Sequence, residues 1–120
     1  RRMIDTTMTR LRSLVERTGI SLFLVSHLRR GHTDQGHEEG ARVSLGQLRG
    51  SAAIAQLSDA VIALERDQQS GSEHSDTIVR VLKNRYSGET GIACKLRYDL
   101  SNCRFTETND TKPFDATTDF

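Results

Sequence analysis

The sequence predicts an α/β fold, with helices flanking a sheet, and three patterns indicate it. Apolar residues recur at helical spacing near the amino terminus, which predicts an amphipathic helix. An apolar run over Ile20–Val25 ends abruptly in polar and basic residues, as a buried parallel strand does where it meets a ligand. Farther along, Ala60–Glu65 and Thr77–Asn84 have the length and the β-branched content of strands.

Length and composition limit the chain to one modest domain. It has 120 residues, of which 35% are hydrophobic, and a net charge of +1. Residues 107–120 hold four acids and one lysine, a net charge of −3, which leaves +4 on residues 1–106. Because the chain starts at Arg1 and a helix begins almost at once, we expect it to be a piece of a longer protein. No apolar run is long enough to cross a bilayer, and Cys94 and Cys103 are expected to be free thiols of a cytoplasmic protein.

The amino-terminal half is expected to alternate helix and strand. The helical stripe ends at Gly19, a residue suited to a helix terminus, and leads into the strand Ile20–Val25, which we expect to be buried. Residues 31–41 are rich in glycine and polar side chains and predict a surface loop. Ser44 with Gln47 three residues later is a capping pattern, and a short helix is expected over Ala52–Leu57. The stripe residues are Met3, Ile4, Met8, Leu11, Leu14 and Val15.

The carboxyl-terminal half is expected to be mostly strand. Ala60–Glu65 predicts a second buried strand, and Thr77–Asn84 alternates apolar and polar positions. Ile92–Tyr98 and Cys103–Phe105 would then complete an antiparallel meander at the edge of the sheet. Residues 107–120 have too little apolar content to fold and predict a disordered acidic tail.

Several separated motifs occur in an order that resembles a known family. They are SHLRR at 26–30, HEEG at 37–40, LGQLRGSAAIAQLSDAVIALERDQQ at 45–69, VLKNRYSGETG at 81–91 and an acidic tail ending in DF. Together they resemble the carboxyl-terminal half of the helicase domain in the primase-helicases of T-odd phages. The mitochondrial and bacterial replicative helicases are similar but more distant.

The resemblance implies a fold, an activity and a cellular setting. It implies that residues 1–106 are the carboxyl-terminal portion of a RecA-like P-loop NTPase domain that assembles into a hexameric or heptameric ring. Such a ring uses ATP or dTTP with Mg²⁺ to translocate on single-stranded DNA and unwind duplex, here in the cytoplasm of a phage-infected bacterium. The glycine loop G-x-x-x-x-G-K-[ST] and the strand with the magnesium-binding acid are absent from this sequence. The chain alone is therefore expected to be catalytically inactive.

Four residues match the family's nucleotide-contacting positions. His27 corresponds to the sensor of the γ-phosphate, and Arg85 to the arginine finger that reaches a neighbouring subunit's nucleotide. Arg66 and Tyr98 match the pair that holds the base between a guanidinium and a phenol ring. Ordinary structural roles stay open for each: a histidine at a strand end, a surface ion pair for Arg85, and packing for Tyr98.

The family's DNA-contacting positions are matched with some departures. Arg29 and Arg30 begin the loop that lines the central channel, where arginines can neutralise backbone phosphates of any sequence. Thr33 and Gln35 stand in this loop, where the family has more lysines, so weaker contact is expected. Arg49, Gly50 and Gln56 match the second DNA-proximal motif, and Ala55 stands where T-odd relatives often have an arginine.

The tail resembles a segment with which T-odd helicases contact the replicative DNA polymerase. Its acids could be attracted to a basic patch, and its terminal phenylalanine could fill an apolar pocket. The residues expected to bind the polymerase are Asp110, Asp115, Asp119 and Phe120.

The sequence leaves two other classes of function open. A metal-dependent hydrolase could use the histidines at 27, 32 and 37 with Glu38 or Glu39, since imidazole and carboxylate are suitable ligands. Two of these histidines lie on the glycine-rich loop, and no metal site is expected. The main alternative is a catalytically inactive module from a split gene that binds single-stranded DNA or a protein.

Overall fold

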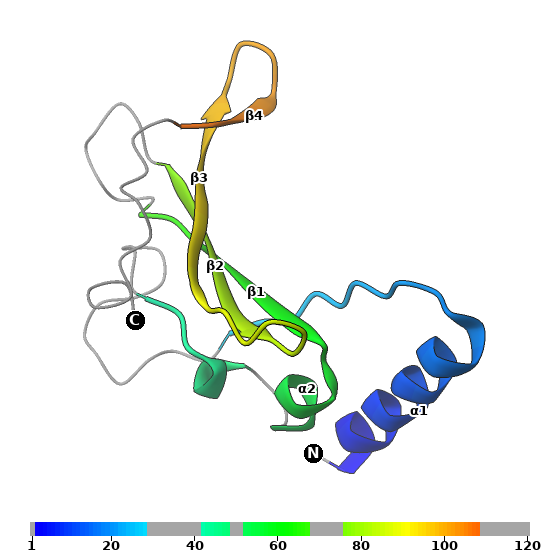
Figure 1. Ribbon diagram of the computed structural model, residues 1–120. Coiled ribbons are helices and arrows are strands. Elements are labelled where there is room, and N and C mark those ends of the chain that lie inside the picture. Colours follow the sequence, from blue (N-terminus) through cyan, green and yellow to red (C-terminus); the bar gives the residue numbers. More distant parts are fainter. Residues whose placement is uncertain (1, 29–41, 49–51, 68–75, 109–120) are drawn as a thin grey trace.

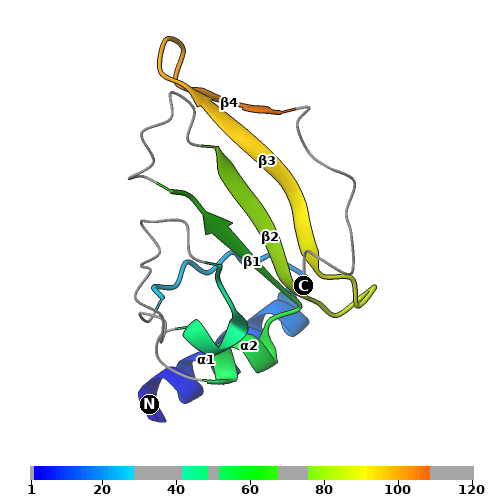
Figure 2. The ribbon, with the colours of Figure 1, turned by 90° about the vertical axis from the view of Figure 1, so that its left-hand side faces the viewer.

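A four-stranded antiparallel sheet is the centre of the computed structural model, which describes residues 2–28, 42–48, 52–67 and 76–108 (Figure 1). The sheet has the strand order β1-β2-β3-β4. Helices α1 and α2 lie near one end of the sheet and β4 lies at the other (Figure 2). The elements are α1 (Arg2–Thr18), the 3₁₀ turn η1 (Leu45–Gln47), α2 (Ala52–Leu57), β1 (Ala60–Glu65), β2 (Thr77–Asn84), β3 (Gly91–Asp99) and β4 (Arg104–Glu107).

Helix α1 confirms the amphipathic pattern. Its apolar side contacts α2, and Met8 of α1 and Ile54 of α2 are both buried. The helix ends at Gly19, whose φ of 70° lies in the left-handed region and whose N–H donates to the Val15 carbonyl at 2.9 Å. This is the αL type of helix ending, in which glycine avoids the steric cost that a Cβ would bring.

The predicted buried strand over Ile20–Val25 is wrong for this structure. No strand is assigned there, and the side chains of Phe23 and Val25 are 91% and 94% exposed. A strand exists only when its N–H and C=O groups pair with a neighbour, and the described residues provide no parallel strand for it. The segment instead joins the structure at Leu28, which forms an isolated antiparallel bridge with Leu48.

Strand β1 has the predicted bounds but only half of the predicted burial. Ala63 and Glu65 are buried, whereas Ile62 and Leu64 are 59% and 66% exposed. β1 is an edge strand of the described sheet, and the alternation of burial along it shows that one of its faces keeps contact with solvent.

The β1–β2 pair contains an irregularity that changes which side chains share a face. Val61 pairs with Lys83 and Ile62 pairs with Val81, so Leu82 is an extra residue on β2. Without it, strand alternation would place Arg80 and Lys83 on opposite faces. With it, Arg80, Lys83 and the following Arg85 all lie on the face to which Ala63 belongs.

The antiparallel meander of β2, β3 and β4 confirms the sequence prediction. Between β2 and β3, the side chain of Asn84 accepts the N–H of Tyr86 at 3.1 Å, and its carbonyl accepts the N–H of Gly88 at 2.8 Å. Strand β4 runs one residue into the predicted tail, to Glu107, and Thr108 donates its N–H to the Lys95 carbonyl at 3.0 Å. The ordered sheet therefore ends later than residue 106, and the remainder of the predicted tail lies outside the described residues.

Candidate functional site

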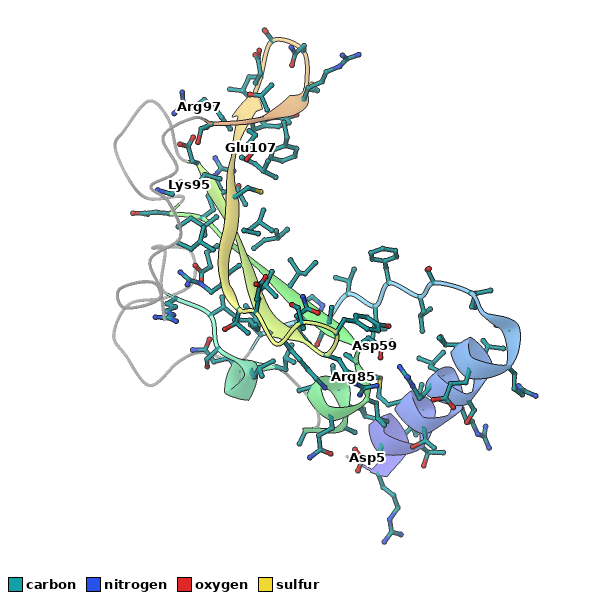
Figure 3. The ribbon with its side chains drawn as sticks, in the orientation of Figure 1. Asp5, Asp59, Arg85, Lys95, Arg97 and Glu107 are labelled. Carbon is teal, nitrogen blue, oxygen red and sulfur yellow. The ribbon has the colours of Figure 1, made fainter. Side chains whose placement is uncertain are left out.

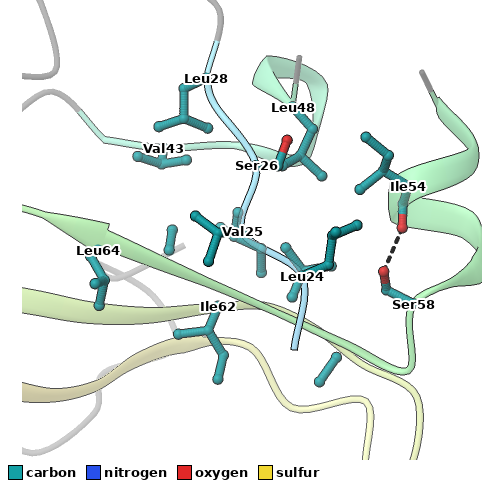
Figure 4. A pocket seen from close by; sticks show the side chains of 14 residues that line it. Leu24, Val25, Ser26, Leu28, Val43, Leu48, Ile54, Ser58, Ile62 and Leu64 are labelled. Atoms are coloured by element: carbon teal, nitrogen blue, oxygen red, sulfur yellow. Dashed lines mark hydrogen bonds between the residues drawn. The ribbon is translucent and has the colours of Figure 1, made fainter. Parts of the chain in front are cut away.

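His27, the expected phosphate sensor, is exposed near the end of the segment 20–28, which follows α1. This segment and β1 line a hollow of about 360 Å³ together with α2 and the chain around η1 (Figure 4). Its lining is mostly apolar and includes Leu24, Leu28, Val43, Leu48, Ile54 and Ile62. His27 therefore follows an apolar stretch, as predicted, although that stretch is not hydrogen-bonded as a strand.

Arg85, the expected arginine finger, is fixed where β2 ends against α2. Its Nη1 lies 2.8 Å from Oδ1 of Asp59, and its Nη2 donates to the carbonyl of Gln56 at 3.1 Å. The backbone N–H of Arg85 also donates to the Asp59 carbonyl at 2.9 Å. Figure 3 shows Asp59 and Arg85 together at the end of the sheet that faces the helices. The side chain stays 42% exposed, so it is accessible as well as oriented.

The backbone carbonyls at the carboxyl end of α2 accept hydrogen bonds from several side chains. Lys83 Nζ donates to the carbonyls of Ala55 and Gln56 at 2.8 and 3.2 Å, and Ser58 Oγ donates to the Ile54 carbonyl at 2.5 Å. The last carbonyls of a helix have no partner within it, and cations there also favour the helix dipole. Gln56, a predicted DNA contact, is exposed on this helix. Its backbone carbonyl accepts the hydrogen bond from Arg85.

Asp59 carries a second ion pair on its other oxygen. Arg12 of α1 places Nη1 at 2.8 Å from Oδ2 of Asp59, while Arg12 Nε lies 3.0 Å from Oε1 of Glu16. The hydrogen bond from Arg12 and the charges of Arg12, Arg85 and Lys83 hold the pKa of Asp59 below its ordinary value. Asp59 is therefore a carboxylate at neutral pH.

Arg66 and Tyr98, the expected base-holding pair, come from the far end of the same sheet. Arg66 directly follows β1, and Tyr98 lies near the end of β3, with β2 between the two strands. The Tyr98 ring packs on Phe105 with centroids 5.0 Å apart, and a hydrogen bond with the Cys103 thiol raises the pKa of Tyr98. The packing role left open for Tyr98 is thus observed, and the residue as a whole is 39% exposed.

Strand register separates Arg85 from the Arg66 end of the sheet. Asn84 lies opposite Ala60, and Ile78 lies opposite Glu65, so Arg85 and Arg66 are at opposite ends of the β1–β2 pair. The seven residue-to-residue steps from Asp59 to Arg66 correspond to roughly 20 Å of strand. In Figure 3 the labelled Arg97, the neighbour of Tyr98, is likewise far from Arg85.

Other predicted positions lie outside the described residues. These are Arg29, Arg30, Arg49 and Gly50, which are expected to contact DNA, and the tail residues Asp110, Asp115, Asp119 and Phe120. Within the described ranges, no three His, Cys, Asp or Glu side chains gather to hold a metal ion. No helix in that part of the chain is long and apolar enough to cross a membrane.

Sequence reasoning missed Asp59, which binds Arg85 in the structure, and Arg12, which binds Asp59. Asp59 and Arg12 are 47 positions apart, and no periodicity connects them. The available signal was the position of Asp59, an acid in the short link between a predicted helix and a predicted strand. Such a residue often binds a cation nearby, but only the tertiary structure identifies which cation.

Comparison with known proteins supports the resemblance found in the motifs. No family model matches the chain. The DNA helicase/primase of Enterobacteria phage T3 is 46% identical over 99 residues, which are 82% of this chain. The match spans 17% of the length of that relative. The chain therefore belongs to the family of the T-odd phage helicase/primases.

Proposed function

We propose that the chain acts as the carboxyl-terminal part of a ring helicase that couples nucleotide hydrolysis to translocation on single-stranded DNA and to duplex unwinding. The identity to a DNA helicase/primase over most of the chain supports this assignment. The RecA-like arrangement belongs to the proposal, because a parallel sheet requires strands that the described residues do not contain. The proposed setting is the cytoplasm of a phage-infected bacterium.

An uncovered apolar face of the sheet supports assembly with more protein. In the β1–β2–β3 register, Ile62 and Leu64 share a face with Val79, Leu96 and Tyr98. Ile62 and Leu64 are strongly exposed, as are Phe23 and Val25 before the sheet. A contiguous exposed apolar surface indicates a contact with another part of a protein. Here the remainder of the helicase domain is the proposed cover.

The separation of Arg85 from Arg66 is the observation that carries the nucleotide assignment. Their backbone positions are roughly 20 Å apart along the strands, so we assign the two residues to two nucleotides and not to the base and the γ-phosphate of one. They can serve two nucleotides if each site lies between subunits. Arg66 and Tyr98 would then hold the base at one interface, and Arg85 would reach the phosphate at another, which requires self-association into a ring.

The nucleotide in this proposal is ATP or dTTP with Mg²⁺. None of the described residues is assigned to the ion, because no suitable cluster of acids or histidines is present among them. What this chain contributes is binding and charge. His27 would hydrogen-bond the terminal phosphate, and Arg85 would neutralise charge that develops on the phosphoryl group in transfer.

DNA contact is proposed for the residues that precede and include α2. Arg29, Arg30 and Arg49 would neutralise backbone phosphates, Gly50 would allow close approach of the strand, and Gln56 would donate hydrogen bonds from α2. The exposed position of Gln56 is compatible with this role.

Subunit mixing tests the proposed function in the intact helicase/primase that contains this chain. Arg85→Ala subunits should bind nucleotide and fail to support hydrolysis at the neighbour's site. Mixing them with subunits that lack the glycine-loop lysine should restore part of the activity, because some interfaces then combine an intact loop with an intact finger. Arg104→Ala, which removes an exposed arginine of β4, is the matched control and should hydrolyse normally. Absence of restoration in rings shown to be mixed would contradict the finger assignment.

A further inference from the structure

Asp59 connects three elements through one carboxylate. Its Oδ1 binds Arg85 at the end of β2, and its Oδ2 binds Arg12 of α1, each at 2.8 Å. Asp59 itself lies between α2 and β1, and its side chain is 29% exposed. Each carboxylate oxygen therefore binds a different guanidinium, which fixes the orientation of the carboxylate.

The contacts hold the Arg85 side chain in place and leave some of its N–H donors available for a ligand. A guanidinium has five N–H donors, of which one points at Asp59 Oδ1 and one at the Gln56 carbonyl. The others remain for a phosphoryl oxygen, and nearly half of the side chain is exposed. A long flexible side chain held at two points loses less conformational freedom when it meets its target.

The extra residue Leu82 in β2 explains why Arg85 meets Asp59 at all. The shift in register puts Lys83 and Arg85 on the face where α2 lies. Lys83 binds the carbonyls at the end of α2, and the Arg85 N–H binds the Asp59 carbonyl at 2.9 Å. The backbone and the side chain of Arg85 are thus both fixed to the same short link.

Arg12 keeps Asp59 in the orientation that Arg85 requires, because it binds the carboxylate oxygen that does not face Arg85. The hydrogen bond from Arg12 is also the main cause of the lowered pKa of Asp59. Arg12 is in turn held by Glu16 one helical turn later, at 3.0 Å. Glu16 touches neither Asp59 nor Arg85 in these contacts.

From this geometry we propose that Asp59, held by Arg12, is a positioning residue that orients Arg85 toward the nucleotide of the adjoining subunit. The proposal rests on the proposed function, since Arg85 must act as a finger for its orientation to matter. Misplacing a catalytic group by about 1 Å can cost about 100-fold in rate.

Steady-state kinetics of the intact helicase/primase test the proposal. Asp59→Ala should lower kcat of DNA-stimulated hydrolysis by about 100-fold and leave KM and single-stranded DNA binding within about twofold. Asp59→Asn, which keeps an acceptor for Arg85, should recover part of the loss and fall by only about 10-fold. Arg10→Gln, which removes another exposed arginine of α1, is the matched control and should keep wild-type kcat.

A double variant separates positioning from a general structural effect. In the Arg85→Ala background, Asp59→Ala should cause no further loss of kcat, because a finger that is absent cannot be misplaced. Asp59→Ala subunits should also regain activity when mixed with glycine-loop lysine variants, as Arg85→Ala subunits do. A full additional loss in the double variant, or a rise in KM equal to the fall in kcat, would overturn the positioning role.

The two proposals fail in different ways. If Arg85→Ala is inactive and Asp59→Ala has wild-type kcat, Asp59 does not position the finger and the proposed function stands. If Arg85→Ala itself has wild-type kcat, the finger assignment fails and the role of Asp59 fails with it.

Discussion

Arg80 of β2 and Glu65 of β1 form an ion pair that solvent hardly reaches. Nε of Arg80 lies 3.0 and 3.1 Å from the two carboxylate oxygens of Glu65, and the side chains are 8% and 2% exposed. One of these oxygens also accepts the N–H of Val43 at 2.6 Å. Val43 is itself the most buried large apolar residue described, at 2%. The pair thus attaches the chain before η1 to the sheet.

Removing one member of this pair should destabilise the fold strongly. Glu65→Gln removes the carboxylate charge that lies 3.0 Å from the buried guanidinium of Arg80, so we expect the free energy of unfolding to fall by about 3–5 kcal/mol. Urea unfolding followed by circular dichroism measures it. Glu16→Gln, which breaks an exposed pair, is the control and should change stability by less than about 1 kcal/mol. Equal losses for the two variants would mean that the burial of the Glu65 pair has no energetic consequence.

Asp59 should titrate at an unusually low pH. Its pKa is lower in the folded chain than in the unfolded chain, so the pair with Arg12 stabilises the fold above the ordinary aspartate pKa. That contribution is lost as the pH falls through the lowered folded value. Arg12→Gln should move the pKa of Asp59 upward, which NMR titration of the side-chain carboxyl carbon would measure. An unchanged pKa in Arg12→Gln would contradict the assigned cause, and Glu16→Gln should leave it nearly unchanged.

Tyr98 should ionise at higher pH than a free tyrosine. The hydrogen bond with Cys103, together with burial, favours the protonated phenol. Cys103→Ala should therefore lower the pKa of Tyr98 toward its ordinary value, as measured by phenolate absorbance. The chain has two tyrosines, and Tyr86 is 82% exposed, so the titration is best done with Tyr86→Phe in the background. Cys94→Ala is the control; if it shifts Tyr98 as much as Cys103→Ala does, the specific bond is excluded.

The proposed DNA contacts should show the salt dependence of phosphate binding. In the intact protein, alanine at Arg29, Arg30 or Arg49 should weaken single-strand binding about equally for all sequences. Each lost phosphate contact should reduce the slope of log K against log salt concentration by about 0.7. Fluorescence anisotropy with several oligonucleotides at three or more salt concentrations measures both quantities. A loss restricted to certain sequences would indicate base recognition instead.

Deletion of the acidic tail should affect polymerase binding and leave hydrolysis nearly intact. The cut belongs after Thr108, because its N–H is bonded to the Lys95 carbonyl of β3. Without residues 109–120, and so without Asp110, Asp115, Asp119 and Phe120, binding to the cognate replicative polymerase should fall most at low salt, where charge is least screened. Phe120→Ala tests the apolar anchor separately. Equal binding of the intact and truncated proteins at low salt would exclude this role.

Local pattern alone determined much of the secondary structure. The helix before Gly19, the short helix Ala52–Leu57 and the strand Ala60–Glu65 were predictable because each depends on spacing and propensity within a few residues. The antiparallel meander was predictable for the same reason, since turns join neighbouring strands. The motif order also identified the family, which the identity to the phage T3 protein confirms.

Only the tertiary structure decided what depends on partners distant in sequence. Ile20–Val25 has a strand's composition, but a strand needs a hydrogen-bonding neighbour, and the described part of the chain offers none. The extra residue Leu82 reverses the face of Lys83 and Arg85, which strict alternation could not foresee. Arg85 meets Asp59, and Asp59 meets Arg12, because the sheet and α1 converge at one corner. Composition specifies which elements can form, and long-range pairing specifies where their charged side chains meet.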